Sequence, residues 1–390
     1  MPLEFRSPLL LVTEEAIPPV YRFSLTEKIA IEIADKGHPV YLVCVKGNGD
    51  FSHRDIQYHP VEINGWSLFD LKKRAEANIR LILKAVQLCR KEDIRLVYGW
   101  WPVLFFTRLT GRKIVSDMPE FIDVMYKSFN KPYSKFVGLC LRLFQRTVAG
   151  LSEYVITESD ISRAIWCSRK IPYEKTIAIP YGVDVEAFIN SSRNENFRED
   201  YGIGKDEPVI MFHGDIGIDD GVDILIEATR GIGAKTVIIG DGDKKYMQYL
   251  KKISSKDVIF TGWIPYREIP GILLNADIYV APFRSSLYTN STFPIKQMEA
   301  MAAGRPVVMS ELHAFSRYVT DKGDCRLVMP GDANNLRSVI SELIVNPEER
   351  KRLGQNAQRT ARKSFDWRIR AGKEASLLIE TADKLAKQGK

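Results

Sequence analysis

Several features are scarce in this chain of 390 residues, and each scarcity excludes a class of protein. The five cysteines are an odd number and none forms a C-x-x-C pair, which argues against a disulfide framework and a zinc knuckle. The longest apolar run, Val97 to Phe106, has half the length needed to span a bilayer, and the N-terminal apolar run is too short for a signal peptide. We therefore expect a cytoplasmic protein, at most peripheral at the cytoplasmic membrane face.

Neither sign of charge dominates, because the chain has 56 basic and 49 acidic residues, which give a net charge of +7. The excess is uneven: residues 1–180 hold 26 basic against 20 acidic residues, and residues 181–390 hold 30 against 29. A basic half can mark a face for an anionic partner, or it can be an ordinary solvated surface. No module of interleaved basic and aromatic residues is present, so we expect no nucleic-acid partner.

Short apolar runs alternate with helix-period segments along almost the whole chain. This alternation predicts an α/β protein with parallel sheets that are covered by helices on both faces. The polar segment 190–207 interrupts the rhythm and is interpreted as a linker, so we expect one domain over 1–190 and another over 191–365, followed by a helix at 366–390. Strands are expected at 8–12, 39–45, 94–98, 113–117, 153–157, 176–180, 208–213, 235–240, 257–262, 277–282, 306–309 and 326–330.

The loops that follow strands are the candidate sites, because ligands of open parallel sheets bind beyond the carboxyl ends of the strands. After the strand at 208–213, Gly214 would allow a ligand close to the backbone, but nearby aspartates would repel a phosphate. Asp241 and Asp243 follow the next strand; they either hold a divalent metal or cap a helix, and we assign no metal site. Gly240 and Gly242 are weak evidence for a dinucleotide site and for a dehydrogenase.

The most informative segment is 281–308. A helix is expected to begin near Pro294, with Ser291 and Thr292 able to cap it and Glu299 one to two turns inside. The neighbours of Glu299 are apolar, which favours a functional carboxylate over a solvated surface charge. Such a carboxylate can accept two hydrogen bonds from the vicinal hydroxyls of a ribose or a sugar. Lys296, on the first turn, could reach a phosphate.

Taken in order, the motifs IPYGVDVEAF, GVDILIEA, VIIGDGDKKYMQYL and PIKQMEAMAAGRPVV resemble those of family 4 retaining glycosyltransferases, the glycosyl transferase group 1, over almost the whole chain. The resemblance implies the GT-B fold: two Rossmann-like parallel-sheet domains facing a cleft, with the last helix crossing back onto the first. The first domain would bind a lipid- or glycan-linked acceptor and the second a nucleotide sugar. No cofactor is implied beyond this donor substrate.

The resemblance also suggests roles in donor binding. Glu299 falls on the second glutamate of the family's E-x7-E motif, which binds the donor ribose, and Ser291 stands where the first glutamate is missing. Backbone groups of Thr292 and Phe293 fall where the family holds the sugar and distal phosphate. Main-chain groups of the pair Trp263–Ile264 fall where the nucleobase binds.

One departure concerns the diphosphate. Asp215 and Asp220 stand where family members keep an arginine and a lysine. At about 4 Å and an effective dielectric constant near 20, each contact between like charges would cost about 4 kcal/mol. Arg284 and Lys296 are the candidate replacements. The alternatives are an atypical donor or a non-catalytic binding or scaffold protein.

On the acceptor side, Asp117 and Glu120 follow the strand at 113–117 and are the candidate catalytic residues; Asp117 would orient or deprotonate the acceptor hydroxyl, or else cap a helix. Tyr21 and Arg22 lie in the first loop, which lacks the family's paired glycines. Further candidates, Trp100 and Trp101, either line the cleft or pack in the core.

The segment 131–147 interleaves basic and apolar residues. It lies on an anionic membrane surface or packs on its own sheet, and the sequence leaves both interpretations open.

Overall fold

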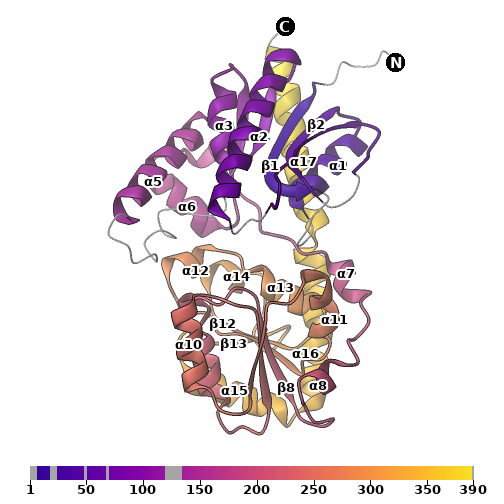
Figure 1. Ribbon diagram of the computed structural model, residues 1–390, viewed down its shortest axis with the longest axis vertical. Coiled ribbons are helices and arrows are strands. Elements are labelled where there is room, and N and C mark those ends of the chain that lie inside the picture. The colour runs from indigo at the N-terminus through magenta and orange to yellow at the C-terminus, as the bar shows by residue number, and fades with distance from the viewer. Residues whose placement is uncertain (1–6, 18–23, 48–50, 67–69, 119–133, 389–390) are drawn as a thin grey trace. The chain divides into compact units, whose positions relative to one another are not determined.

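The computed structural model describes residues 7–17, 24–47, 51–66, 70–118 and 134–388 (Figure 1). The chain divides into two compact units. Unit 1 comprises Met1–Pro180 together with Arg368–Lys390, and unit 2 comprises Tyr181–Trp367. The segment 190–207, expected to be a linker, is part of unit 2, because it forms helix α8 (Phe197–Asp200) and buries the side chains of Phe197 and Ile203.

Unit 1 is built on a seven-stranded parallel sheet in the order β3-β2-β1-β4-β5-β6-β7. Its core strands are continuous apolar runs buried on both faces, as helix-covered parallel sheets require. The strands are β1 (Leu9–Ile17), β2 (Val40–Lys46), β3 (Ile56–Val61), β4 (Leu96–Gly99), β5 (Lys113–Asp117), β6 (Tyr154–Thr157) and β7 (Thr176–Ala178). The helices are α1 (Leu25–Asp35), α2 (Leu71–Lys91), α3 (Trp101–Arg108), α5 (Ser134–Leu151), α6 (Asp160–Ser168) and α17 (Trp367–Gln388).

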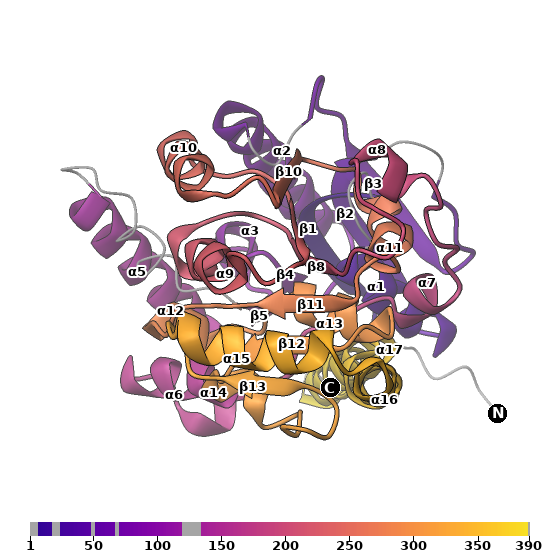
Figure 2. The same cartoon turned by 90° about the horizontal axis from the view of Figure 1, so that it is seen from below.

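Unit 2 is built on a six-stranded parallel sheet in the order β10-β9-β8-β11-β12-β13. Figure 2 shows this succession from β10 through β8, β11 and β12 to β13. The strands are β8 (Val209–His213), β9 (Lys235–Ile239), β10 (Val258–Gly262), β11 (Ile278–Ala281), β12 (Val307–Ser310) and β13 (Arg326–Val328).

Helices cover both faces of the unit 2 sheet and close a separate apolar core on each face. One face carries α9 (Val222–Thr229), α10 (Lys244–Ile253) and α15 (Ala333–Ile344). The other carries α7 (Val185–Ile189), α11 (Ile269–Leu273), α13 (Ile295–Ala302) and α16 (Pro347–Thr360) (Figure 1). Two short helices, α12 (Leu287–Ser291) and α14 (His313–Ser316), contact each other.

The prediction of two parallel-sheet Rossmann-like units is confirmed, and each expected strand overlaps a strand of the structure. The elements that were not expected include the edge strand β3, the short helix α8 and α12 within the loop after β11. Within the described residues, no helix combines the length and the apolar character that crossing a membrane requires.

Candidate functional site

The candidate site of unit 2 lies where the strand order reverses. The chain adds β9 and β10 on one side of β8 and then places β11 on its other side, so β8 and β11 flank a topological switch point. Open α/β sheets bind ligands at the carboxyl ends of strands beside such a point. His213 ends β8 there and Gly214 follows it, while Phe283 and Arg284 follow β11.

Glu299 is the buried acid of this site. It lies on α13 with only 4% of its surface exposed, so it is not a solvated helix charge. One carboxylate oxygen lies 2.7 Å from Nε2 of His213, and the other accepts a hydrogen bond of 2.7 Å from the hydroxyl of Tyr266. A carboxylate offers about four acceptor positions, and these two partners fix its orientation.

Lys296 lies one turn before Glu299 and forms an ion pair. Its ammonium group is 2.5 Å from Oδ1 of Asp220 and donates to the main-chain oxygen of Asp215 at 2.9 Å. Gly214 has φ +120°, and a Cβ atom there would meet Cε of Lys296 at 2.9 Å. The positive φ favours glycine at this position, and a larger residue would also displace the end of the Lys296 side chain.

Arg284 is also paired with an acid. Its Nη2 lies 2.5 Å from Oδ2 of Asp223, whose other oxygen accepts a hydrogen bond of 3.0 Å from the hydroxyl of Tyr246. Burial, with the charge of Asp223 as a second cause, raises the pKa of the Tyr246 hydroxyl, so it stays protonated as a donor. The two candidate replacement cations are thus each paired with an aspartate. Arg284 pairs with Asp223 on α9, and Lys296 pairs with Asp220 in the loop after β8.

The residues before α13 are arranged differently from the expectation. Helix α13 begins at Ile295 with Pro294 as its N-cap and no side-chain cap. Neither Ser291 nor Thr292 caps it: Ser291 is fully buried at the end of α12, where its hydroxyl donates to the main-chain oxygen of Tyr288. These residues cannot reach the α13 amides because the chain folds into α12 instead of remaining a loop.

Phe293 and the pair after β10 differ in exposure. The ring of Phe293 is buried against Phe315 and Phe365, with ring centroids 4.8 and 5.7 Å away. Trp263 directly follows β10 and is 59% exposed, whereas Ile264 packs partly against the core. An exposed indole at the carboxyl edge of the sheet is available for stacking.

In unit 1, Asp117 ends β5 and is tied to the C-terminal helix. Both of its carboxylate oxygens accept from Nη2 of Arg370 on α17, at 3.2 and 3.3 Å. Burial raises the pKa of Asp117, and the guanidinium of Arg370 opposes that rise. Arg370 forms ion pairs with both carboxyl groups, those of Asp117 and Glu374.

The other acceptor-side candidates fall into two groups. Trp101 is buried in the unit 1 core, with its ring 5.2 Å from that of Phe144, as the core-packing interpretation proposed. Trp100 is partly buried and packs against the same core. Three further candidates lie outside the described residues: Tyr21, Arg22 and Glu120.

Three contacts of the candidate site were missed from the sequence. His213 and Tyr266 hold Glu299, and Asp223 holds Arg284. His213 could have been found, because it is a polar residue that ends a buried strand; nothing local marks Tyr266 or Asp223. Asp243 caps α10 by accepting from two backbone amides, and no cluster of metal-ligating residues occurs in the described ranges.

Comparisons with known proteins agree with this architecture. Residues 193–360 match the family described as glycosyl transferases group 1. An uncharacterized glycosyltransferase of Methanocaldococcus jannaschii is 29% identical over 195 residues, which are 50% of each chain. The GDP-mannose-dependent alpha-(1-6)-phosphatidylinositol monomannoside mannosyltransferase of Mycolicibacterium smegmatis is 26% identical over 246 residues, 60% of this chain and 64% of that protein. The chain spans about half the length of the curated relatives it matches.

The solved structure of sucrose-phosphate synthase from Thermosynechococcus elongatus gives a TM-score of 0.75 at 18% identity. The alignment covers 96% of this chain and 99% of that one, and at this identity the likeness shows the fold alone. Residues 193–360 thus carry the similarity to the glycosyl transferases group 1, and the two parallel-sheet units have the GT-B fold.

Proposed function

We propose that the chain is a retaining glycosyltransferase that moves a hexosyl group from a nucleotide sugar to a hydroxyl of a lipid- or glycan-linked acceptor. The observation that carries the proposal is the buried Glu299 at the switch point of unit 2, held by His213 and Tyr266. A buried, oriented carboxylate is suited to two vicinal hydroxyls, because both can donate to it at once. Those hydroxyls would be the ribose diol of the donor.

The phosphates of the donor would lie at the amino end of α13. The amides of its first turn have no side-chain cap, and the positive end of the helix macrodipole favours an anion there. Lys296 stands on the same turn, although Asp220 offsets its charge. The site would therefore stabilise a leaving phosphate mainly through oriented amides, which need no reorganisation during the reaction.

The nucleobase and the acceptor hydroxyl complete the proposed arrangement. Trp263 would offer its exposed indole face to the base, because stacking requires no particular hydrogen-bond pattern. Asp117 would orient the acceptor hydroxyl, and its raised pKa would suit a group that takes up a proton. The bond between the sugar and the leaving phosphate breaks, and a bond forms to the acceptor oxygen.

A binding experiment tests the donor site. GDP-mannose is the first donor to try, because the Mycolicibacterium smegmatis relative is named as dependent on it; UDP-glucose is the second. We expect Glu299→Gln to weaken donor binding at least tenfold in calorimetry, because hydrogen bonds to a charged group contribute about 1.5–3 kcal/mol. The exposed Glu348→Gln on α16 should bind as the wild type does. Absence of binding and of transfer with every nucleotide sugar offered would refute the proposal.

A second candidate is a glycosyltransferase-like binding protein without turnover. Asp215 favours it, because its exposed side chain stands where the family resemblance expects a cation, and it makes no ion pair within the described residues. The two candidates differ in a transfer assay with a bound donor. Release of free nucleotide in the presence of acceptor, abolished in Glu299→Gln, supports the enzyme; binding without release supports the alternative.

The acceptor would reach unit 1 from a membrane surface. Helix α5 carries exposed apolar side chains, Phe136 at 71%, Leu139 at 50% and Leu143 at 52%, beside the exposed Arg142. Such a face suits the boundary of an anionic bilayer. We expect co-sedimentation with anionic vesicles at low salt and its loss when the three apolar residues become serine. Equal sedimentation of the triple variant would contradict this part of the proposal.

A further inference from the structure

A pocket of about 470 Å³ lies in unit 2 at the edge of the sheet away from the candidate site. Asp277 and Pro306, which immediately precede β11 and β12, line it, so it marks the amino ends of these strands. Its opposite wall is α16, through residues 347–358. Pockets of roughly 300–1,000 Å³ accommodate small molecules, so the volume suits a metabolite better than a single ion.

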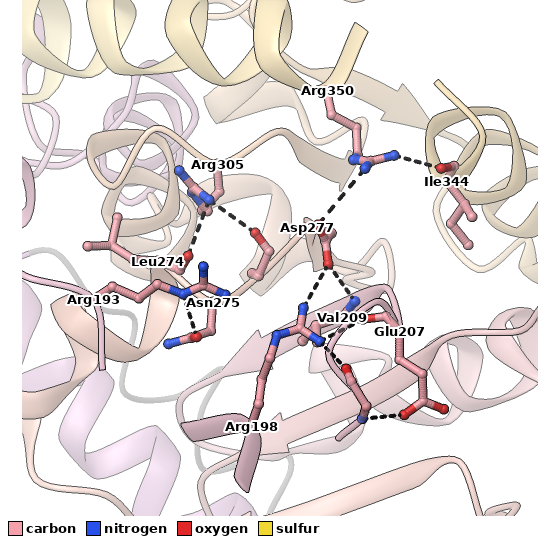
Figure 3. A network of polar contacts seen from close by, with 12 residues as sticks. Arg193, Arg198, Glu207, Val209, Leu274, Asn275, Asp277, Arg305, Ile344 and Arg350 are labelled. Atoms are coloured by element: carbon pink, nitrogen blue, oxygen red, sulfur yellow. Dashed lines mark hydrogen bonds and ion pairs between the residues drawn. The ribbon is translucent and has the colours of Figure 1, made fainter. Parts of the chain in front are cut away.

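The lining of this amino-edge pocket is basic. It includes the cations Arg305, Arg350 and Lys351 and a single carboxylate, Asp277. Figure 3 shows Arg198 and Arg350 in contact with that carboxylate, while the guanidinium of Arg305 is directed to the main-chain oxygen of Leu274. The charge of Asp277 is already shared, because it lies 3.5 Å from Arg198 and 3.9 Å from Arg350 and accepts from the amide of Val209.

The hydrogen bonds that hold the two arginines go to neutral main-chain oxygens, and Arg350 also lies 3.9 Å from Asp277. Arg305 donates to Leu274, Ala276 and Ala303, and Arg350 donates to Leu343 and Ile344. Hydrogen bonds to main-chain oxygens fix each guanidinium without cancelling its charge, and Asp277 is shared between Arg350 and Arg198. Nη2 of Arg305 donates no hydrogen bond within the described residues.

Other groups complete the electrostatic picture. Burial lowers the pKa of Arg305, and the neighbouring Arg193 lowers it further while Asp277 opposes this. Lys351 and Gln355 project from α16, are exposed and contact no charged or polar partner among the described residues. The C-termini of α15 and α11, at residues 344 and 273, each carry only about half a negative charge. They therefore do not neutralise the basic residues that line the pocket.

We propose that the amino-edge pocket binds a small phosphorylated ligand, with the phosphate group between Arg305, Arg350 and Lys351. Arginine matches phosphate because its planar group presents two N–H donors in parallel, and the two guanidiniums are already immobilised. Gln355 and Gln358 line the remaining space and would bind hydroxyls of the ligand. This site is separate from the donor site, and it does not depend on the proposed transferase activity.

Titration calorimetry with inorganic pyrophosphate at low salt tests the proposal. Lys351→Glu and Gln355→Glu add negative charge to the pocket without breaking a contact of the fold, and each should weaken binding at least tenfold. Lys363→Glu is the matched control: it makes the same charge change as Lys351→Glu, at an exposed position of unit 2 that does not line the pocket. It should change the affinity less than threefold.

Pyrophosphate could instead bind at the switch point, and Lys296→Met separates the two sites. Binding that survives Lys296→Met and is lost in Lys351→Glu supports the amino-edge pocket. Binding that is lost in Lys296→Met and survives Lys351→Glu overturns it, as does the absence of binding to the wild type. Thermal unfolding of every variant, compared with the wild type, verifies that each one is folded.

Discussion

The buried charge cluster that ties α17 to the unit 1 sheet should make the stability of the protein depend on pH. Arg370 and Glu374 are 1% and 0% exposed, and Nε of Arg370 lies 2.5 Å from Oε1 of Glu374. The hydroxyl of Tyr98 donates to the other oxygen of Glu374 at 2.5 Å. Burial raises the pKa of Glu374 from 4.5 to about 7; Arg370 opposes this rise and Asp117 adds to it.

The sign of the effect follows from proton binding. Between pH 4.5 and 7 the folded state retains a proton on Glu374 that the unfolded chain has lost. The free energy of unfolding therefore falls as the pH rises through this window, and it levels off above pH 7. At about 1.4 kcal/mol per pH unit, the difference between the two pKa values corresponds to about 3 kcal/mol.

Glu374→Gln tests this reasoning, because glutamine keeps the size of the side chain and an acceptor for Tyr98 but does not ionise. Urea unfolding followed by circular dichroism at pH 5 and pH 8 gives the change in stability. We expect the wild type to lose about 2.5 kcal/mol between these pH values, because part of the change lies below pH 5, and the variant to lose far less. Glu380→Gln, at an exposed position on the same helix, should keep the wild-type slope. The reasoning fails if Glu374→Gln is destabilised relative to the wild type more at pH 8 than at pH 5.

Three further changes have calculable effects. Gly99→Ala should destabilise unit 1 by more than about 3 kcal/mol in thermal unfolding, because φ is +139° and the new Cβ would lie 1.9 Å from the oxygen of Val12. Phe293→Ala should cost about 3–5 kcal/mol of unfolding free energy in urea, because the ring is 2% exposed within an aromatic cluster. Asp220→Asn should tighten nucleotide-sugar binding about three- to tenfold in calorimetry, because it frees the charge of Lys296.

Each of these changes has a control in the same chain. Gly150→Ala on α5 meets no atom within 4 Å and should be neutral or slightly stabilising. Phe136→Ala removes an exposed ring and should cost less than about 0.5 kcal/mol. Asp206→Asn, at an exposed position before β8, should leave donor affinity unchanged. Equal effects in a test variant and its control would contradict the corresponding prediction.

The central strands of both units are predictable from sequence because each is a continuous apolar run that a helix-covered parallel sheet requires. Strand β3 is not predictable in this way, since it is an edge strand whose sequence contains Gln57 and Pro60. Helix α12 is missed for another reason. Its residues have weak helix propensity, and a capping box between Ser286 and Thr289 stabilises its first turn.

Within the site, sequence identifies single residues better than pairs. The apolar neighbours of Glu299 and its place on a helix after a strand are local signals, and its burial is confirmed. The partners of Lys296 and Asp117 are not local: Asp220 lies 76 residues from the lysine, and Arg370 lies 253 residues from Asp117. Pairing at such separations depends on which loops the strand order of the sheet places side by side. The periodicity of apolar residues in the sequence does not predict this order.

The pairing of Asp220 changes the electrostatic argument about the donor site. Taken alone, Asp215 and Asp220 would each repel a diphosphate by about 4 kcal/mol at about 4 Å. In the structure, Lys296 offsets the charge of Asp220, and Asp215 is exposed, where water and salt screen it. The charge of Asp220 is therefore offset within the fold, while Asp215 and Asp219 leave the loop with a negative charge. A phosphate there would depend on the first-turn amides of α13, whose favourable interaction does not require a free cation. A site of this kind should show a weaker salt dependence of donor binding than a clamp of arginine and lysine, because fewer full charges meet in it.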